Sequence, residues 1–73
     1  MIKIHGVLHL TVNGEPRETT EGTTIGHLVV ALGAHPEGVA VAVNGEVVPR
    51  AEQAHRVLKD GDRVEIIRAV GGG

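Results

Sequence analysis

The sequence predicts a single α+β domain in which one mixed β-sheet is covered on one face by one main helix. A length of 73 residues suits one small domain. Two alternating apolar runs each end at an Asn-Gly pair, and one amphipathic helical stretch lies between them. Because one apolar helix stripe needs one sheet face to cover, these observations together favour a layer of strands beneath a single helix.

Two hairpins are predicted where the alternating runs end. Asn-Gly supplies the positive φ angles that a two-residue hairpin turn requires, and it occurs at Asn13-Gly14 and at Asn44-Gly45. The tetrapeptide Val-Asn-Gly-Glu begins at Val12 and again at Val43. The alternating positions are Leu8, Leu10 and Val12 before the first turn, and Val39, Val41 and Val43 before the second.

The residues before the first hairpin allow two interpretations. Ile2 and Ile4 share the parity of Leu8, so the first strand extends back to the N-terminus with Gly6 as a bulge, or else Met1 to Val7 form a loose leader.

The helix is predicted by an apolar stripe at i, i+3, i+4 and i+7. Thr23 or Thr24 offers the N-cap hydroxyl, Gly33 closes the helix in a left-handed conformation, and Pro36 prevents its continuation. The stripe consists of Ile25, Leu28, Val29 and Leu32.

The second half of the chain ends in one more strand. Pro49 ends the strand before it, and residues 50–59 form an irregular segment with a helical turn around residues 52–55. Val57 and Leu58 are expected to attach this segment to the core. Residues 60–62, Asp-Gly-Asp, make a turn, and residues 63–70 form the last strand.

This element order is that of the β-grasp (ubiquitin-like) roll, with the last strand parallel and adjacent to the first. A five-stranded barrel is the competing architecture, but it leaves the helix stripe without a partner. We expect residues 1–70 to form the β-grasp domain. The expected core comprises Leu10, Val12, Ile25, Leu28, Val29, Leu32, Val41, Val43, Leu58, Val64 and Ile66.

Composition excludes several classes of function. The chain has no cysteine and no aromatic residue, so it has neither a thiolate nucleophile nor a base-stacking platform. A formal net charge of -2 gives no basis for nucleic-acid binding. No stretch approaches the roughly 20 apolar residues of a membrane span, so we expect a cytoplasmic protein with no membrane or nucleic-acid partner. A chain this short has little room for a catalytic cleft, and we expect no catalytic residues.

The five histidines do not predict a metal site. His5 and His9 share a strand face but lie about 13 Å apart along it, which is too far to chelate one ion. His27, His35 and His55 fall on separate elements. We therefore expect surface histidines and no bound metal or intrinsic cofactor.

The terminal glycines are the most informative feature. Gly71, Gly72 and Gly73 follow a strand directly, and three consecutive glycines form a thin, flexible tail that can enter a narrow site in a partner protein. Ile67 breaks the alternation of the last strand and indicates either burial on both sheet faces or a docking patch. Ile67 and Arg68 are accordingly candidate partner contacts.

Two runs of the sequence resemble the thiamine-pathway sulfur carrier protein family, ThiS. The first is VAVAVNGEVVPR, from Val39 to Arg50, and the second is LKDGDRVEIIRAVGGG, from Leu58 to Gly73. The likeness covers about residues 8–73, and Met1 to Val7 depart from the pattern. The Asp-Gly-Asp turn is common to β-grasp proteins, whereas the first run combined with terminal glycines is more specific.

This resemblance implies a carrier that is acted on by enzymes and is not one itself. It implies that the carboxylate of Gly73 is adenylated by a ThiF-type adenylyltransferase using ATP and magnesium. A cysteine desulfurase relay then supplies sulfur for a thiocarboxylate, which is delivered to thiazole synthase, while Gly71 and Gly72 thread into the partner sites. A carrier for molybdopterin or another sulfur-inserting pathway, and a ubiquitin-like protein modifier, remain as alternatives.

Overall fold

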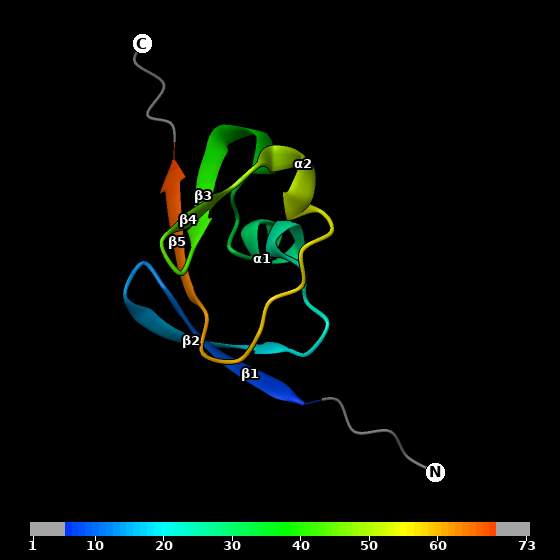
Figure 1. Cartoon of the computed structure of the whole chain (residues 1–73), viewed down its shortest axis with the longest axis vertical. Coiled ribbons are helices and arrows are strands. Elements are labelled where there is room, and N and C mark those ends of the chain that lie inside the picture. The colour runs from blue at the N-terminus through cyan, green and yellow to red at the C-terminus, as the bar shows by residue number, and fades with distance from the viewer. Residues whose placement is uncertain (1–5, 69–73) are drawn as a thin grey trace.

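The computed structural model describes residues 6–68, and Figure 1 shows their arrangement. The elements in chain order are β1 (Val7–Val12), β2 (Glu15–Thr20), α1 (Ile25–Ala31), the 3-10 turn η1 (Pro36–Gly38), β3 (Val39–Val43), β4 (Glu46–Val48), α2 (Arg50–Gln53) and β5 (Arg63–Arg68). Among these residues, no helix is long and apolar enough to cross a membrane.

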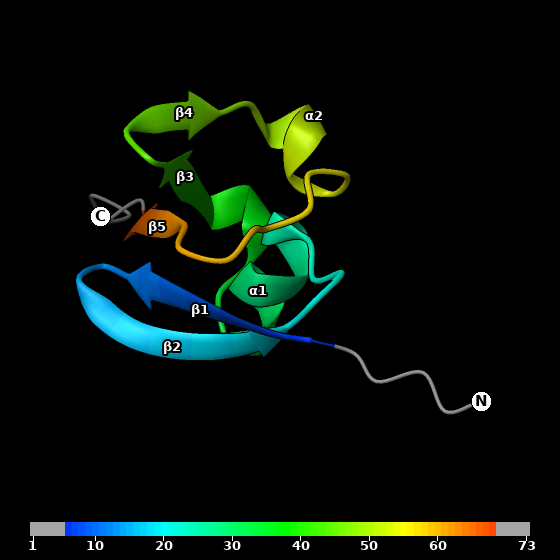
Figure 2. The ribbon, with the colours of Figure 1, turned by 60° about the horizontal axis from the view of Figure 1, so that its bottom comes forward.

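The five strands form one mixed sheet in the order β2-β1-β5-β3-β4. β1 and β5, the first and last strands, are neighbours and parallel, whereas the other pairs are antiparallel. α1 lies against one side of the sheet (Figure 2). The predicted β-grasp roll is therefore confirmed. The barrel alternative is wrong, because β2 and β4 are the two edges of the sheet and do not pair with each other.

Both predicted hairpins form around left-handed Asn-Gly pairs. φ is 51° at Asn13 and 83° at Gly14, and it is 54° at Asn44 and 85° at Gly45. Positive φ at both central residues is the signature of a type I′ turn, whose twist matches that of the flanking strands. The repeated tetrapeptide thus has the same local structure in both places.

Helix α1 begins and ends as its sequence predicts. The Thr24 hydroxyl accepts a hydrogen bond from the His27 backbone N–H at 3.2 Å. Gly33 has a φ of 83°, and its N–H donates to the Val30 carbonyl at 2.9 Å. The left-handed residue after the helix lets the backbone turn back and satisfy carbonyls of the last turn.

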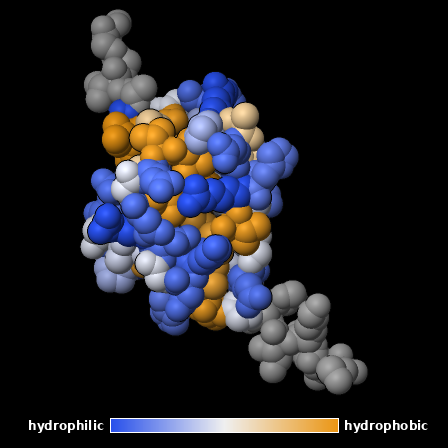
Figure 3. Space-filling view, viewed as in Figure 1, coloured by the Kyte–Doolittle hydropathy of each residue, from blue (hydrophilic) through white to orange (hydrophobic). Residues whose placement is uncertain are grey.

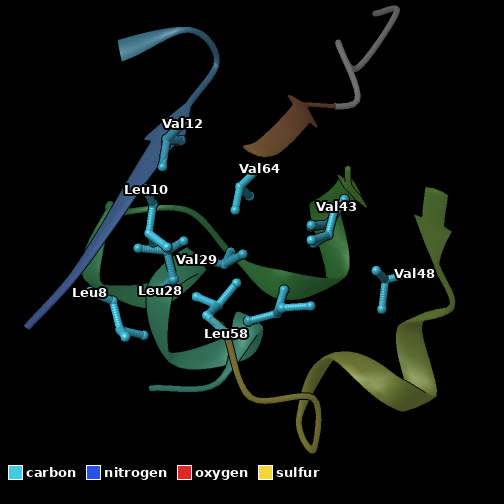
Figure 4. Packing of buried hydrophobic residues seen from close by; sticks show 11 residues of the cluster. Leu8, Leu10, Val12, Leu28, Val29, Val43, Val48, Leu58 and Val64 are labelled. Atoms are coloured by element: carbon cyan, nitrogen blue, oxygen red, sulfur yellow. The ribbon is translucent and has the colours of Figure 1, made fainter. Parts of the chain in front are cut away.

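The core lies between α1 and the covered face of the sheet (Figure 4). Of the expected core, Leu32 and Ile66 are only partly buried and pack against its margin. Leu8 and Val48 are buried although they were not on the expected list. The buried cluster comprises Leu8, Leu10, Val12, Ile25, Leu28, Val29, Val41, Val43, Val48, Leu58 and Val64.

The segment between β4 and β5 contains a short helix, α2, that starts two residues earlier than the predicted turn. It begins directly after Pro49, whose φ of -55° suits the entry to a helix. Leu58 is 3% exposed, as expected, but Val57 is 49% exposed, so the expectation that Val57 attaches the segment to the core is wrong. Val57 forms an extended bridge with Thr24, and neighbouring residues of an extended segment point to opposite sides.

The start of β1 and the end of β5 lie at the limits of the described residues. The Gly6 carbonyl accepts from the Glu21 N–H at 2.9 Å, so pairing with β2 reaches back to Gly6. Met1 to His5 lie outside the described residues, and the choice between strand extension and leader stays open. The last strand is described to Arg68, and its predicted continuation to Val70 lies outside the described residues.

Candidate functional site

The predicted reacting group, Gly73, and the predicted thread, Gly71 and Gly72, lie outside the described residues. What the structure describes is the strand that leads to them. β5 is the central strand, paired with β1 on one side and β3 on the other, and its Val64 is fully buried. The segment after Arg68 therefore follows from a strand in the middle of the sheet.

An apolar patch lies on the open face of the sheet, opposite α1. Ile67 pairs with Ala40, and Ala42 pairs with Val47 and with Glu65. Ile67 is 65% exposed and Val47 is 76% exposed. We call Ala40, Ala42, Val47 and Ile67 the open-face patch. Figure 3 shows hydrophobic surface over this part of β3, β4 and β5.

The position of Ile67 decides between its two interpretations. Burial on both faces of the sheet is wrong, because the side chain is largely exposed and no described element covers that face. Ile67 and Val47 lie on the same face of the sheet with β3 between them, and several apolar residues exposed on one face are typical of a contact surface, whereas single exposed apolar residues are ordinary. The docking interpretation of Ile67 stays a prediction.

Arg68 ends β5 as an exposed residue between two shallow hollows. A hollow of about 260 Å³ is lined by residues that include Asn13, Arg17, Ile66 and Arg68. A second hollow, of about 190 Å³, lies on the other side of Arg68, between it and the segment that follows α1. Arg68 shares the parity of Val64 and Ile66, so its side chain lies on the covered side of the sheet, beside the segment that follows α1, whereas the open-face patch lies on the opposite side.

The histidines do not gather around a metal position. His9 Nε2 lies 3.3 Å from Glu18 Oε2, and His9 Nδ1 lies 3.6 Å from Asp60 Oδ1. All three side chains are about two-thirds exposed, so these contacts are surface pairs with little effect on stability. Over residues 6–68, no three histidine or carboxylate side chains lie close enough to hold a metal ion.

One buried polar residue was missed by the sequence analysis. Gln53 of α2 is 4% exposed, and its Nε2 donates to the Val48 carbonyl at a long 3.4 Å. Its Oε1 has no hydrogen-bond partner within the described part of the chain. Gln53 lines a hollow of about 350 Å³ between α1 and α2, far along the chain from the predicted tail. Nothing in the sequence pattern distinguishes this glutamine from an exposed one.

Comparison with known proteins relates the chain to one family. The model of the ThiS family matches residues 10–73. The sulfur carrier protein ThiS of Thermus thermophilus is 40% identical over 62 residues, which cover 85% of this chain and 95% of that protein. A crystal structure of the thiamine biosynthesis protein ThiS from Geobacter metallireducens has 41% identity and a TM-score of 0.71, covering 90% of this chain and 100% of that one.

A larger relative contains a similar stretch. A thiazole synthase of Magnetococcus marinus is 40% identical over 72 residues, or 99% of this chain. This chain spans only 20% of that protein's length. The similarity therefore lies in one segment of a longer protein.

Proposed function

This chain belongs to the ThiS family, the sulfur carriers of thiamine biosynthesis, which are not themselves enzymes; from that premise we propose that Gly73 is the residue that carries the sulfur. Its carboxylate is first adenylated and then converted to a thiocarboxylate. The observation that supports this most directly is the extent of the family match, which runs from residue 10 through Gly73 and so includes the terminal glycines as well as the folded domain.

The two steps follow from the chemistry of a carboxylate. A carboxylate oxygen attacks the α-phosphate of ATP and releases pyrophosphate, which makes AMP a good leaving group on the carbonyl carbon. Sulfur supplied through a cysteine desulfurase relay arrives as a protein persulfide, whose terminal sulfur displaces AMP and forms an acyl disulfide. A thiol reductant then cleaves the S–S bond and leaves the thiocarboxylate on Gly73. A ThiF-type adenylyltransferase provides the ATP and magnesium sites, so this chain needs to contribute only the reacting carboxylate and a surface by which it is held.

The open-face patch provides that surface in this proposal, and Arg68 is a separate candidate contact on the other side of the end of β5. Ile67 is exposed and lies one residue from the end of β5, and Val47 extends the apolar area toward the edge strand. Burial of apolar area in a partner contributes roughly 25 cal/mol per Å² before the costs of association. A partner that binds this patch contacts the protein one residue before the end of β5, close to the point where the segment after Arg68 begins.

Thiazole synthase is the proposed acceptor of the sulfur. The support is that a thiazole synthase contains a stretch similar to nearly all of this chain. Two modules joined by a short linker meet at an effective concentration in the millimolar range. Their fusion in one chain is therefore typical of proteins that act on each other.

Deletion of Gly73 tests the proposal. The full chain is incubated with a ThiF-type enzyme, ATP, magnesium, a cysteine desulfurase, cysteine and a thiol reductant, and its intact mass is measured. We expect replacement of one oxygen by sulfur in the full chain and no change of mass in the deletion variant. Because the deletion removes no part of the described core, its free energy of unfolding should stay within about 0.5 kcal/mol of the parent.

Other results of the same experiment separate the alternatives. Adducts in which Gly73 is joined to lysine residues of other proteins indicate a protein modifier. Thiocarboxylate that is consumed by a molybdopterin-forming enzyme and not by thiazole synthase assigns the carrier to that other pathway. An unmodified full chain, with the enzymes shown to be active on their own carrier, would overturn the proposal.

A further inference from the structure

The two Val-Asn-Gly-Glu turns both contact β5, the strand that leads to the tail. The backbone N–H of Asn13 donates to the Val64 carbonyl at 2.9 Å, and that of Asn44 donates to the Arg63 carbonyl at 2.8 Å. Neither contact follows from the turn conformation, which a pair of glycines would also adopt. Each turn therefore continues the backbone pairing of its preceding strand with β5 by one residue.

The side-chain amides extend this pairing. Asn13 Oδ1 accepts from the Ile66 N–H at 2.8 Å, and Asn13 Nδ2 donates to the Ile66 carbonyl at 3.3 Å. Asn44 Oδ1 accepts from the Arg63 N–H at 2.9 Å. A carboxamide presents the same donor and acceptor as a peptide group, so Asn13 stands in for one more residue of a neighbouring strand, whereas the Asn44 Nδ2 donates to Asp62 Oδ1 at 2.9 Å.

Strand polarity places the two asparagines at opposite ends of β5. β3 is antiparallel to β5, so the turn that follows β3 lies beside Arg63, where β5 begins. β1 is parallel to β5, so the turn that follows β1 lies beside Ile66, near its end. Identical tetrapeptides thus hold the start and the end of the same strand.

The end of β5 depends on Asn13 on its β1 side. β1 itself pairs only with Arg63 and Val64. Over residues 6–68, the hydrogen bonds to that edge of β5 beyond Val64 come from the Asn13 side chain. On the other edge, pairing with β3 continues through Ile67 and Arg68. Without Asn13, the last residues of β5 would be held from one side only.

We propose that Asn13 is a positioning residue of the carrier, which fixes the end of β5 so that Ile67 stays in the open-face patch and the tail begins at a defined point. This inference rests on the proposed function. Release of Ile66, Ile67 and Arg68 would remove Ile67 from the docking surface. It would also add three residues to the chain between the last held residue and Gly73, which lowers the effective concentration of Gly73 at a partner site.

The first test uses amide hydrogen exchange to measure the hydrogen bonds between the Asn13 side chain and the Ile66 backbone. Asn13→Gly keeps the positive φ of the turn and removes the side chain, and Asn44→Gly is the matched control at the other end of β5. We expect the Ile66 amide to exchange about tenfold faster in Asn13→Gly, as loss of one ordinary hydrogen bond implies. In Asn44→Gly its exchange rate should equal that of the parent, once the rates are corrected for the difference in the free energy of unfolding between the variants. Asn13→Asp retains the 2.8 Å acceptor and should return the rate to within about threefold of the parent.

The second test measures the consequence for adenylation by a ThiF-type enzyme, at a temperature at which all variants are fully folded. We expect Asn13→Gly to raise KM about threefold to tenfold with little change in kcat, because docking is impaired while the reacting carboxylate is intact. Asn44→Gly should keep the KM of the parent.

The outcomes separate this inference from the function on which it rests. Unchanged exchange at Ile66 in Asn13→Gly overturns the inference, as does an equal rise in KM for both glycine variants. If the parent chain is not adenylated at all, the proposed function fails and the positioning role with it, while the exchange data still decide whether Asn13 holds the end of β5.

Discussion

The two faces of the central strands use apolar residues for different purposes. On the covered face, Val41 and Val43 of β3 are each 1% exposed and Val64 of β5 is 0% exposed. On the open face of β5, three residues beyond Val64, Ile67 is 65% exposed. Because successive side chains of a strand point to opposite faces, one short sequence can supply both a core and a contact surface. In this chain, the core and the proposed docking surface lie on opposite faces of the same strands.

Substitution on the covered side should have the largest effect on stability. Leu28 of α1 is 4% exposed within the core. We expect Leu28→Ala to lower the free energy of unfolding by about 2–5 kcal/mol, since the removed atoms leave a cavity that a small domain cannot fully close. Urea denaturation measures the loss.

Val30 is the matched control on the same helix. Its side chain is 60% exposed, and we expect Val30→Ala to change stability by no more than about 0.5 kcal/mol. Equal losses in the two variants would contradict the separation of the helix into a buried and an exposed side.

Substitution on the open face should have a smaller effect, and on binding instead of stability. We expect Ile67→Thr to weaken binding to the activating enzyme about tenfold, because an exposed apolar side chain near the centre of a contact contributes more than 1 kcal/mol. Threonine keeps the β-branched shape that strands favour, so stability should change by no more than about 0.5 kcal/mol. Isothermal titration calorimetry and urea denaturation measure the two quantities.

Val30→Thr again provides the control, since Val30 is similarly exposed but lies on α1, away from the patch. It should bind as the parent does. Undiminished binding by Ile67→Thr would remove Ile67 from the docking surface and leave the open-face patch as ordinary exposed surface.

The fold was predictable because its signals are local and periodic. Asn13-Gly14 and Asn44-Gly45 fix the two hairpins, and the stripe that ends before Gly33 fixes the helix. Each signal depends on backbone sterics or on side-chain period, which a sequence displays directly. Given two hairpins, one helix and a final strand, the covered sheet follows from the need to bury one helix face.

The errors lie where tertiary packing decides. Whether Val57 or Leu58 points inward depends on the direction in which the segment crosses the molecule, and only Leu58 does. Ile66 and Leu32 are half-buried because they lie at the margin of the core, which periodicity does not reveal. For the candidate site, the sequence identified Ile67 but not the rest of the open-face patch, because the register between strands is needed to place Ala40 opposite Ile67 and Val47 opposite Ala42. The hydrogen bonds between Asn13 and Ile66 were not predictable either, because they join residues that are 53 positions apart.

The smallest expected effect belongs to Gln53, the buried polar residue on the covered side. Its Nε2 has one long hydrogen bond of 3.4 Å, and its Oε1 has no partner within the described residues. A buried acceptor without a partner costs about 1–3 kcal/mol, which offsets most of what the glutamine contributes. Gln53→Met keeps a side chain of similar length and removes both polar atoms, so we expect stability to be unchanged or raised by up to about 1 kcal/mol.

Gln53→Glu sharpens this comparison, because it keeps the shape and adds a charge at a position that is 4% exposed. We expect it to destabilise the domain at neutral pH by more than about 1 kcal/mol, since burial of an unpaired charge is costly. Both variants should bind the activating enzyme as the parent does, because Gln53 lies on α2 and takes no part in the open-face patch. A loss of more than about 2 kcal/mol in Gln53→Met would mean that the amide makes a strong hydrogen bond, and that the covered side depends on polar as well as apolar contacts.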